Sequence, residues 1–192
     1  MRSKQAQDLE AQLLTLAAEA DEVERYSTPH ATFIAQLSEA LGRHLGLRGS
    51  DLVALRYAAL VHDLGERVMK RDYLERRGEL TWDERLDLWR HPVLGEQAAA
   101  QRELPRQAQL LIRWHHEWWN GQGYPDALAG ENIPLGARIL RLADTYSALT
   151  SARPYRSRME AEAARQVIID SAGLEFDPQV VQAFIEVIKP EL

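Results

Sequence analysis

The spacing of hydrophobic and polar positions predicts α-helices along almost the whole chain. Apolar residues recur every three or four positions, the period of one helix face, and no segment shows the two-residue alternation of a half-buried strand. The chain is therefore predicted to fold as an all-α helical bundle. We expect a helix that begins at Pro92 and others over residues 5–24, 30–45, 52–64, 81–90, 104–115, 134–149, 158–171 and 177–188.

Segment 52–64 differs from the other predicted helices because it is apolar almost all round. Such a helix is central and buried. It ends with His62 and Asp63, and a buried imidazole or carboxylate costs free energy unless it is paired, hydrogen-bonded or bound to a metal ion. The position of this pair therefore favours a metal site.

Residues 118–134 have no helical period and are rich in glycine and proline. This composition predicts a loop. A loop of this length inside a compact domain usually has a functional role, so we expect it to be ordered.

The predicted helix over residues 5–24 carries an apolar stripe that includes Leu9, Leu13 and Leu16. Two interpretations of this amphipathic helix are open. It packs on its own domain, or it is a linker that forms a homodimer through these leucines. We divide the chain into an N-terminal helix or linker, residues 1–25, and a main domain, residues 26–192.

The composition suits a single domain with a sizeable core. The 192 residues carry a formal net charge of −6, which argues against a nucleic-acid polymer as partner but allows a small phosphorylated ligand held by local arginines. The chain has no cysteine, no signal-peptide core and no apolar stretch near the ~20 residues that a membrane span needs. We therefore expect a cytoplasmic protein that does not enter the membrane.

Two adjacent pairs, His62-Asp63 and His115-His116, stand in a chain with only six histidines. Imidazole nitrogen and carboxylate oxygen are ligands that Zn, Mn and Fe(II) accept where no thiolate is offered. Seven such ligands suit two octahedral ions bridged by Asp63, which is the usual device for phosphoester hydrolysis. The remaining candidate ligands, on other predicted helices, are His30, His91 and Asp144.

A series of short motifs follows in a fixed order along the chain. They are His62-Asp63-x-Gly65, His91-Pro92-x-x-Gly95, His115-His116-Glu117, Gly121-x-Gly123-Tyr124-Pro125, Gly130-Glu131-x-Ile133-Pro134, Leu142-Ala143-Asp144 and Ser151-x-Arg153-Pro154-Tyr155-Arg156. From about residue 27 to residue 188 the chain thereby resembles the HD-GYP family of the HD-domain phosphohydrolase superfamily. The resemblance implies an all-α HD-domain bundle with an ordered GYP loop and a di- or trinuclear Fe or Mn site that hydrolyses cyclic di-GMP.

Carried over to this sequence, the resemblance implies two ligand sets that share Asp63. Arg153 and Arg156 resemble phosphate-binding positions, a role that suits guanidinium groups. Tyr124 resembles the signature position of the loop, where it offers a ring and a hydroxyl to substrate or packs within the loop. The first ligand set is His30, His62, Asp63 and Asp144, and the second adds His91, His115 and His116.

Three positions depart from the family pattern. Glu66 stands where the family usually has a Lys that can hold phosphate, and His62-Asp63-x-x-Glu66 also resembles HD-family 5′-nucleotidases, in which such a Glu is implicated in proton transfer. Tyr26 replaces the Glu of members with three ions, so two ions are expected. Asn120 replaces an Asp and keeps a hydrogen bond without the charge.

The expected function is hydrolysis of cyclic di-GMP by a metal-bound hydroxide, with Asp63 and Glu66 as the catalytic candidates. The expected cofactors are two divalent ions, Fe or Mn, with Zn, Ni or Co as alternatives. Two other functions stay open. One is an HDxxE-type phosphomonoesterase that acts on nucleotides, and the other is a metal-holding domain that binds cyclic di-GMP or a partner protein with little turnover.

Overall fold

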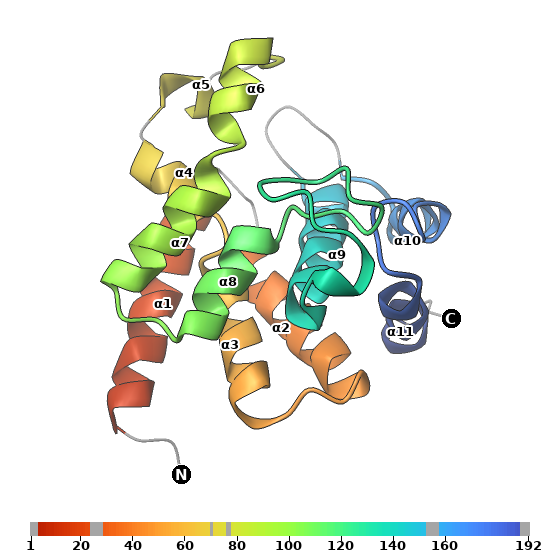
Figure 1. Cartoon of the computed structure of the whole chain (residues 1–192), viewed down its shortest axis with the longest axis horizontal. Helices are drawn as coiled ribbons and strands as arrows, with labels where there is room; N and C mark the ends of the chain where they lie inside the picture. Colours follow the sequence, from red (N-terminus) through yellow and green to blue (C-terminus); the bar gives the residue numbers. More distant parts are fainter. Residues whose placement is uncertain (1–3, 24–28, 70, 76–77, 153–157, 189–192) are drawn as a thin grey trace.

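The structure, a computed structural model, describes residues 4–23, 29–69, 71–75, 78–152 and 158–188. These residues form helices and loops with no β-strand, which confirms the predicted all-α class (Figure 1). The elements are α1 Lys4–Val23, α2 His30–His44, α3 Gly49–Leu60, α4 Leu64–Met69, α5 Asp72–Glu75, α6 Trp82–Leu88, α7 His91–Gln101, α8 Arg106–Trp114, the 3-10 helix η1 Gly130–Asn132, α9 Leu135–Thr150, α10 Ala161–Asp170 and α11 Pro178–Val187.

Helix α3 is the centre of the bundle, as its apolar sequence predicts. It packs against α1, α2, α8 and α9, and Leu55, Ala58 and Leu60 are fully buried. The helix ends at Leu60, four residues earlier than expected, because the backbone of Val61 leaves the helical region at φ −135°. His62 and Asp63 therefore lie in a turn between α3 and α4 rather than on a helix.

Close packing of α4 against α7 explains why the chain turns at this point. A Cβ atom added to Gly65 would lie 1.9 Å from the carbonyl oxygen of His91. Only glycine allows the two backbones to approach so closely. The contact places the start of α4 beside the start of α7, and so brings Asp63 near His91.

Helix α1 packs on its own chain, which decides between the two interpretations of its stripe. Leu13 is 1% exposed and Ala17 is fully buried in the common core, while Leu9 and Leu16 pack against that core. The predicted homodimer contact is not supported, because Leu13, one of its three leucines, is buried in the core of its own chain. The proposed division of the chain at residue 25 stays a prediction.

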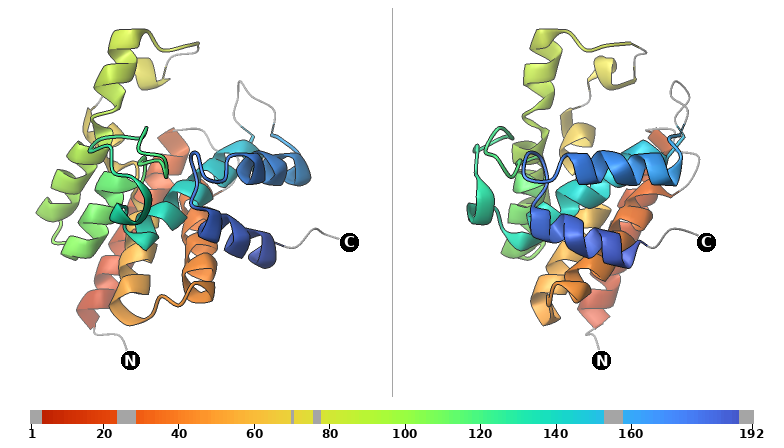
Figure 2. Two further views of the ribbon diagram at one scale, coloured as in Figure 1. Left: turned by 45° about the vertical axis from the view of Figure 1, so that its right-hand side comes forward. Right: turned by 90° about the vertical axis from the view of Figure 1, so that its right-hand side faces the viewer.

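Helices α5 and α6 project from one end of the bundle in all three views (Figures 1 and 2). Helix α6 has no buried residue and begins with the capping box that Thr81 and Glu84 predict. Its side chains Trp82 and Leu86 are exposed. The projection thus carries apolar side chains that the core does not use.

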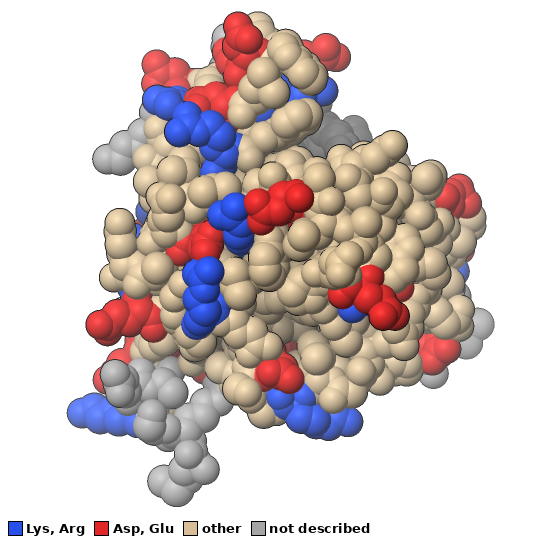
Figure 3. Space-filling view, in the orientation of Figure 1, with Lys and Arg blue, Asp and Glu red and all other residues tan. Residues whose placement is uncertain are grey.

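Acidic and basic side chains are intermixed on the face of the molecule that Figure 3 shows. On the face in Figure 3, the acidic and basic side chains that the structure describes are scattered, several in adjacent pairs of opposite sign. None of the described helices is both long enough and apolar enough to cross a membrane.

Candidate metal centre

All seven predicted ligands converge at one end of α3. His30 and His91 are the first residues of α2 and α7, and His115 is the residue at which α8 ends. Asp144 lies in the middle of α9. Their ligand atoms form two groups, each within 4.8 Å: His30, His62 and Asp144, and then Asp63, His91, His115 and His116.

Asp63 lies between the two groups. Its Oδ2 is 2.9 Å from Nε2 of His62, in the first group. Its Oδ1 is 3.4 Å from Nε2 of His91 and 3.5 Å from Nε2 of His115, in the second. Asp144 completes the first group, with Oδ1 3.7 Å from His62 Nε2 and 3.9 Å from His30 Nε2.

The hydrogen bonds around the centre leave imidazole lone pairs directed inward. Nδ1 of His62 lies 3.1 Å from Ala59 O, that of His91 2.9 Å from Leu88 O, and that of His115 2.7 Å from Ile112 O. A carbonyl can only accept, so Nδ1 carries the hydrogen in each ring and a neutral ring keeps its lone pair on Nε2.

These lone pairs face one another and the Asp63 carboxylate. Nε2 of His91 and Nε2 of His115 are 3.4 Å apart, and the buried Nε2 of His62 lies against the carboxylates of Asp63, at 2.9 Å, and Asp144, at 3.7 Å. So many acceptors in one buried space repel each other unless a cation lies among them. The donor set of imidazoles and carboxylates therefore fits divalent transition-metal ions.

The titration of the buried groups also suits metal binding. Burial lowers the pKa of His30 and of His91 to about 4, so both rings are neutral at pH 7. Burial opposes ionisation of Asp63, but the neighbouring His62 and His115 outweigh it and hold the Asp63 pKa well below its usual value. His62 differs, because the carboxylates of Asp63 and Asp144 outweigh burial and raise its pKa well above the usual value, so a metal ion bound there would displace the Nε2 proton. Neutral imidazoles and an ionised carboxylate are the forms that bind metal ions.

His116 differs from the other histidines of its group. Arg141 donates a hydrogen bond of 3.0 Å to Nδ1 of His116, so this nitrogen is the acceptor. The same guanidinium pairs with Asp144, at 3.8 Å, and with Glu175. The sequence reasoning missed Arg141, although its position three residues before Asp144 places it on the same side of a helix.

The loop after α8 is ordered, as predicted, and Glu117 is its anchor. The buried carboxylate of Glu117 accepts hydrogen bonds from the backbone of Asp126, at 2.7 Å, and of Leu128, at 3.0 Å. Gly123 lies so close to the chain that an added Cβ would be 2.2 Å from Trp118 N. The loop holds Tyr124 with its ring stacked on His116 at a centroid distance of 4.8 Å.

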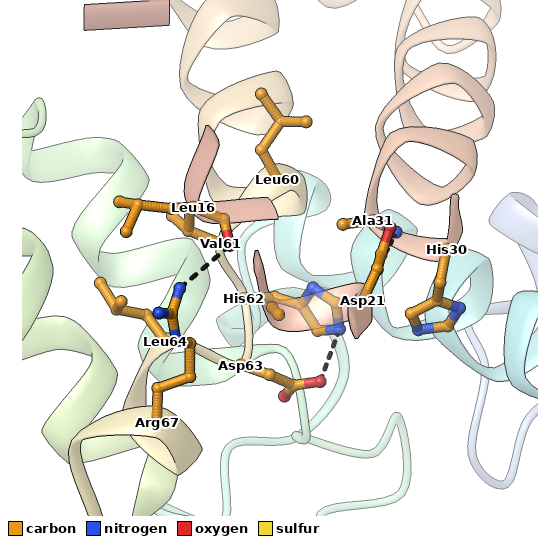
Figure 4. Close-up of a pocket in the computed structure, with 11 residues that line it drawn as sticks. Leu16, Asp21, His30, Ala31, Leu60, Val61, His62, Asp63, Leu64 and Arg67 are labelled. Atoms are coloured by element: carbon orange, nitrogen blue, oxygen red, sulfur yellow. Dashed lines mark hydrogen bonds and ion pairs between the residues drawn. The ribbon is translucent and has the colours of Figure 1, made fainter. Parts of the chain in front are cut away.

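Helix α1 contacts the centre, a role that the sequence did not predict. Asp21 accepts a hydrogen bond of 3.1 Å from the backbone N–H of Ala31 and so caps the start of α2, where His30 lies. Figure 4 shows Asp21 between His62 and His30. A small cavity of about 20 Å³ lies between α1 and the centre, and Asp21, His30 and His62 are among the residues that line it. Arg67 of α4 donates to the carbonyl oxygen of Leu16 at 3.1 Å.

The remaining predicted residues have different outcomes. Glu66 is half-buried in the first turn of α4. Burial is the main cause that raises the pKa of Tyr124, and the negative charge of Glu66 adds to it. Asn120 keeps a hydrogen bond, because its Oδ1 accepts from Gln122 N at 3.0 Å. Tyr26, Arg153 and Arg156 lie outside the described residues, so their predicted roles stay predictions.

Comparison with known proteins agrees with this geometry. The chain is 33% identical over 199 residues to the cyclic di-GMP phosphodiesterase response regulator RpfG of Xanthomonas campestris, covering 95% of this chain and 53% of the relative. It is 34% identical over 190 residues to a cyclic di-GMP phosphodiesterase of Vibrio cholerae, covering 91% of this chain and 39% of that relative. The chain thus spans about half the length of these relatives, or less.

The fold is also that of a solved structure. The crystal structure of a cyclic GMP-AMP specific phosphodiesterase of V. cholerae superposes with a TM-score of 0.74 at 23% identity, over 93% of this chain and 48% of the other. The family profile described as "HD domain" matches residues 9–180. The chain therefore belongs to the HD-domain family, in the HD-GYP branch that its motifs indicate.

Proposed function

We propose that this chain hydrolyses a phosphodiester bond of cyclic di-GMP at a binuclear centre that holds two divalent ions, Fe or Mn. The first ion would be held by His30, His62, Asp63 and Asp144, and the second by Asp63, His91, His115 and His116. One observation carries the proposal, namely that the two oxygens of Asp63 face different groups of histidines. A carboxylate in that position suits a bridge between two ions.

Divalent ions held by these residues would supply positive charge for the phosphoryl oxygens and would lower the pKa of a bound water. The chain contributes the orientation of the ligands, because backbone carbonyls fix the rings of His62, His91 and His115. Arg141 adds a guanidinium at the edge of the centre that could pair with a phosphate oxygen. Arg153 and Arg156 are expected to serve the same purpose.

The names of the relatives support the substrate class. Two are cyclic di-GMP phosphodiesterases, and the solved structure is of a cyclic GMP-AMP specific phosphodiesterase. All three act on cyclic dinucleotides by name, which favours a diester substrate over a nucleoside monophosphate.

An anaerobic reconstitution tests the proposal. The full chain is stripped of metal, loaded with Fe(II) or Mn(II), and assayed in parallel on cyclic di-GMP, cyclic GMP-AMP, a linear dinucleotide and nucleoside monophosphates. We expect two ions per chain and preferential hydrolysis of cyclic di-GMP. Preferential hydrolysis of monophosphates would contradict the proposal and support the phosphomonoesterase, and tight binding without turnover would support the binding domain.

Glu66 distinguishes the two enzymatic interpretations. If Glu66 transfers a proton, Glu66→Gln and Glu66→Lys should both lower turnover by roughly 10²–10⁴-fold, the usual contribution of general acid–base catalysis. If Glu66 only weakens phosphate binding, Glu66→Lys should raise activity on cyclic di-GMP. The first outcome is expected, because an anion beside a phosphate site otherwise opposes substrate binding. Glu79→Gln, at an exposed Glu outside the motifs, is the control.

A further inference from the structure

A continuous row of aromatic rings connects the metal centre with the projecting helix α6. Tyr124 stacks on His116 at a centroid distance of 4.8 Å and an interplanar angle of 24°. Trp89 stacks on Tyr124 at 5.3 Å and 23°. Trp82 then meets Trp89 edge to face, at 5.8 Å and 78°. The row therefore begins at a candidate metal ligand and ends on the surface.

The open rings of this row are the two indoles. Tyr124 lies between His116 and Trp89, in near-parallel stacking with each, so its faces are covered. Trp89 is 36% exposed and Trp82 is 64% exposed. Together with Leu86 they form one apolar side of α6, at spacings of four and three residues.

The two indoles are held in place by their backbone. Trp82 is the first helical residue and lies within the capping box that Thr81 and Glu84 form. Trp89 ends the helix with its N–H bonded to the carbonyls of Arg85 and Asp87. A fixed backbone and a side chain with two rotatable bonds lose little conformational entropy when a ligand stacks on them.

The chemistry of the row matches a nucleobase. Exposed aromatic rings next to a phosphate site are the usual platform for bases of single-stranded nucleotides. In a dinucleotide each base is separated from its phosphate by one sugar, and here the ring of Tyr124 separates Trp89 from His116, with Trp82 one ring further out. Asp87, beside Trp89, is already paired with Arg71 at 2.8 Å and Arg90 at 3.2 Å, so it presents no free anion to a nucleotide.

We propose that Trp82 and Trp89 form a stacking platform for a purine base of the cyclic dinucleotide whose phosphate lies at the metal centre. This inference rests on the proposed function. Direct continuity with the centre favours a substrate base over a partner protein, because a partner would have no need of rings that reach a metal ligand. Since every base has a stacking face, the platform confers affinity for a base rather than choice among bases.

Trp82→Ala in the full chain is the decisive variant, because among the described ring contacts Trp82 joins the row through Trp89 alone. Stacking of one base is worth about 1–3 kcal/mol by alanine substitution, so the KM and the Kd for cyclic di-GMP should rise roughly 5- to 150-fold. The change should fall on KM rather than kcat. Trp82→Phe keeps a ring and should retain most of the affinity. Leu174→Ala removes an apolar side chain of similar exposure, 58%, and is the control.

Hydrolysis and calorimetric binding of cyclic di-GMP are measured separately, so that the two proposals can fail separately. A KM and a Kd of Trp82→Ala within twofold of the original would overturn the platform, even if cyclic di-GMP is hydrolysed. Binding that depends on Trp82 in a chain without hydrolysis would support the platform and contradict the proposed function. A chain that neither binds nor hydrolyses cyclic di-GMP would overturn both.

Discussion

Asp63 directs one carboxylate oxygen at His62 of the first group of candidate ligands and the other at His91 of the second group, to which Asp63 belongs. Asp63→Asn replaces one of those oxygens by an NH₂ group, which cannot bind a cation. We expect metal content to fall from two ions to one or none. Loss of a residue that only hydrogen-bonds a metal ligand usually lowers activity by roughly 10–100-fold, and the loss of hydrolysis here should be larger.

Metal analysis of the purified variant measures this effect. Asp51→Asn is the matched control, because Asp51 is an exposed carboxylate that bonds only Gln107 among the contacts described, at 3.0 Å. If Asp63→Asn retains two ions and normal turnover, Asp63 is not the bridge.

His91 also predicts how stability depends on pH in the metal-free protein. Its pKa is lowered by burial to about 4, whereas an unfolded histidine titrates near 6.5. Between these values the unfolded chain binds a proton that the folded chain does not, so the free energy of unfolding falls as the pH falls from 6.5 towards 4. The same holds for His30.

His91→Gln removes one such group. The urea midpoint of unfolding is measured in EDTA at pH 7 and at pH 5. The decrease in this midpoint from pH 7 to pH 5 should be smaller for His91→Gln than for the original chain. His44→Gln, at a surface histidine 3.1 Å from Glu186, is the control. An unchanged pH dependence in His91→Gln would show that His91 is not buried in the neutral form.

At the scale of elements, α1 is part of the core rather than an independent linker. Leu13→Ala should destabilise the chain by about 2–5 kcal/mol, the usual cost of removing a buried leucine side chain. Leu14→Ala, next to it but 38% exposed, should change the free energy of unfolding by less than about 0.5 kcal/mol. Urea unfolding measures both.

Light scattering of the same variants addresses the dimer that the leucine stripe first suggested. Because Leu13 faces the chain's own core, the original chain, Leu13→Ala and Leu14→Ala should all have the same molecular mass in solution. A mass that halves in Leu13→Ala without loss of stability would restore the dimer interpretation.

At the scale of the whole molecule, the candidate ligands tie together α2, the turn after α3, α7, the end of α8 and α9. Metal ions bound there stabilise the folded state but not the unfolded chain. At a free Mn(II) concentration 100 times the Kd, the gain is about 2.7 kcal/mol per site. For a chain of this size the thermal midpoint should rise by about 5–10 °C for each occupied site.

Thermal unfolding with and without Mn(II) tests this expectation. Asp63→Asn should show a smaller rise, because fewer ions bind. An equal rise in the variant would mean that the ions bind elsewhere on the chain.

The sequence by itself predicted most of the helices, though not α4 or α5, and the chemistry of the centre. Helical period is a local property, so it predicted the segments that became α2, α8 and α9 to within a few residues. Ligand chemistry is equally local, because only imidazole and carboxylate groups were available in a chain without cysteine. All seven ligands could therefore be nominated before their positions in space were known.

Tertiary structure alone decided how those ligands divide and what surrounds them. The early end of α3 at Val61, the contact of Asp21 with α2 and the hydrogen bond from Arg141 to His116 join segments distant in the sequence or depend on close packing. The stack of Trp89 on Tyr124 joins residues 35 positions apart, counting from 89 to 124. Periodicity describes one helix face at a time, whereas such contacts depend on how faces of different helices meet.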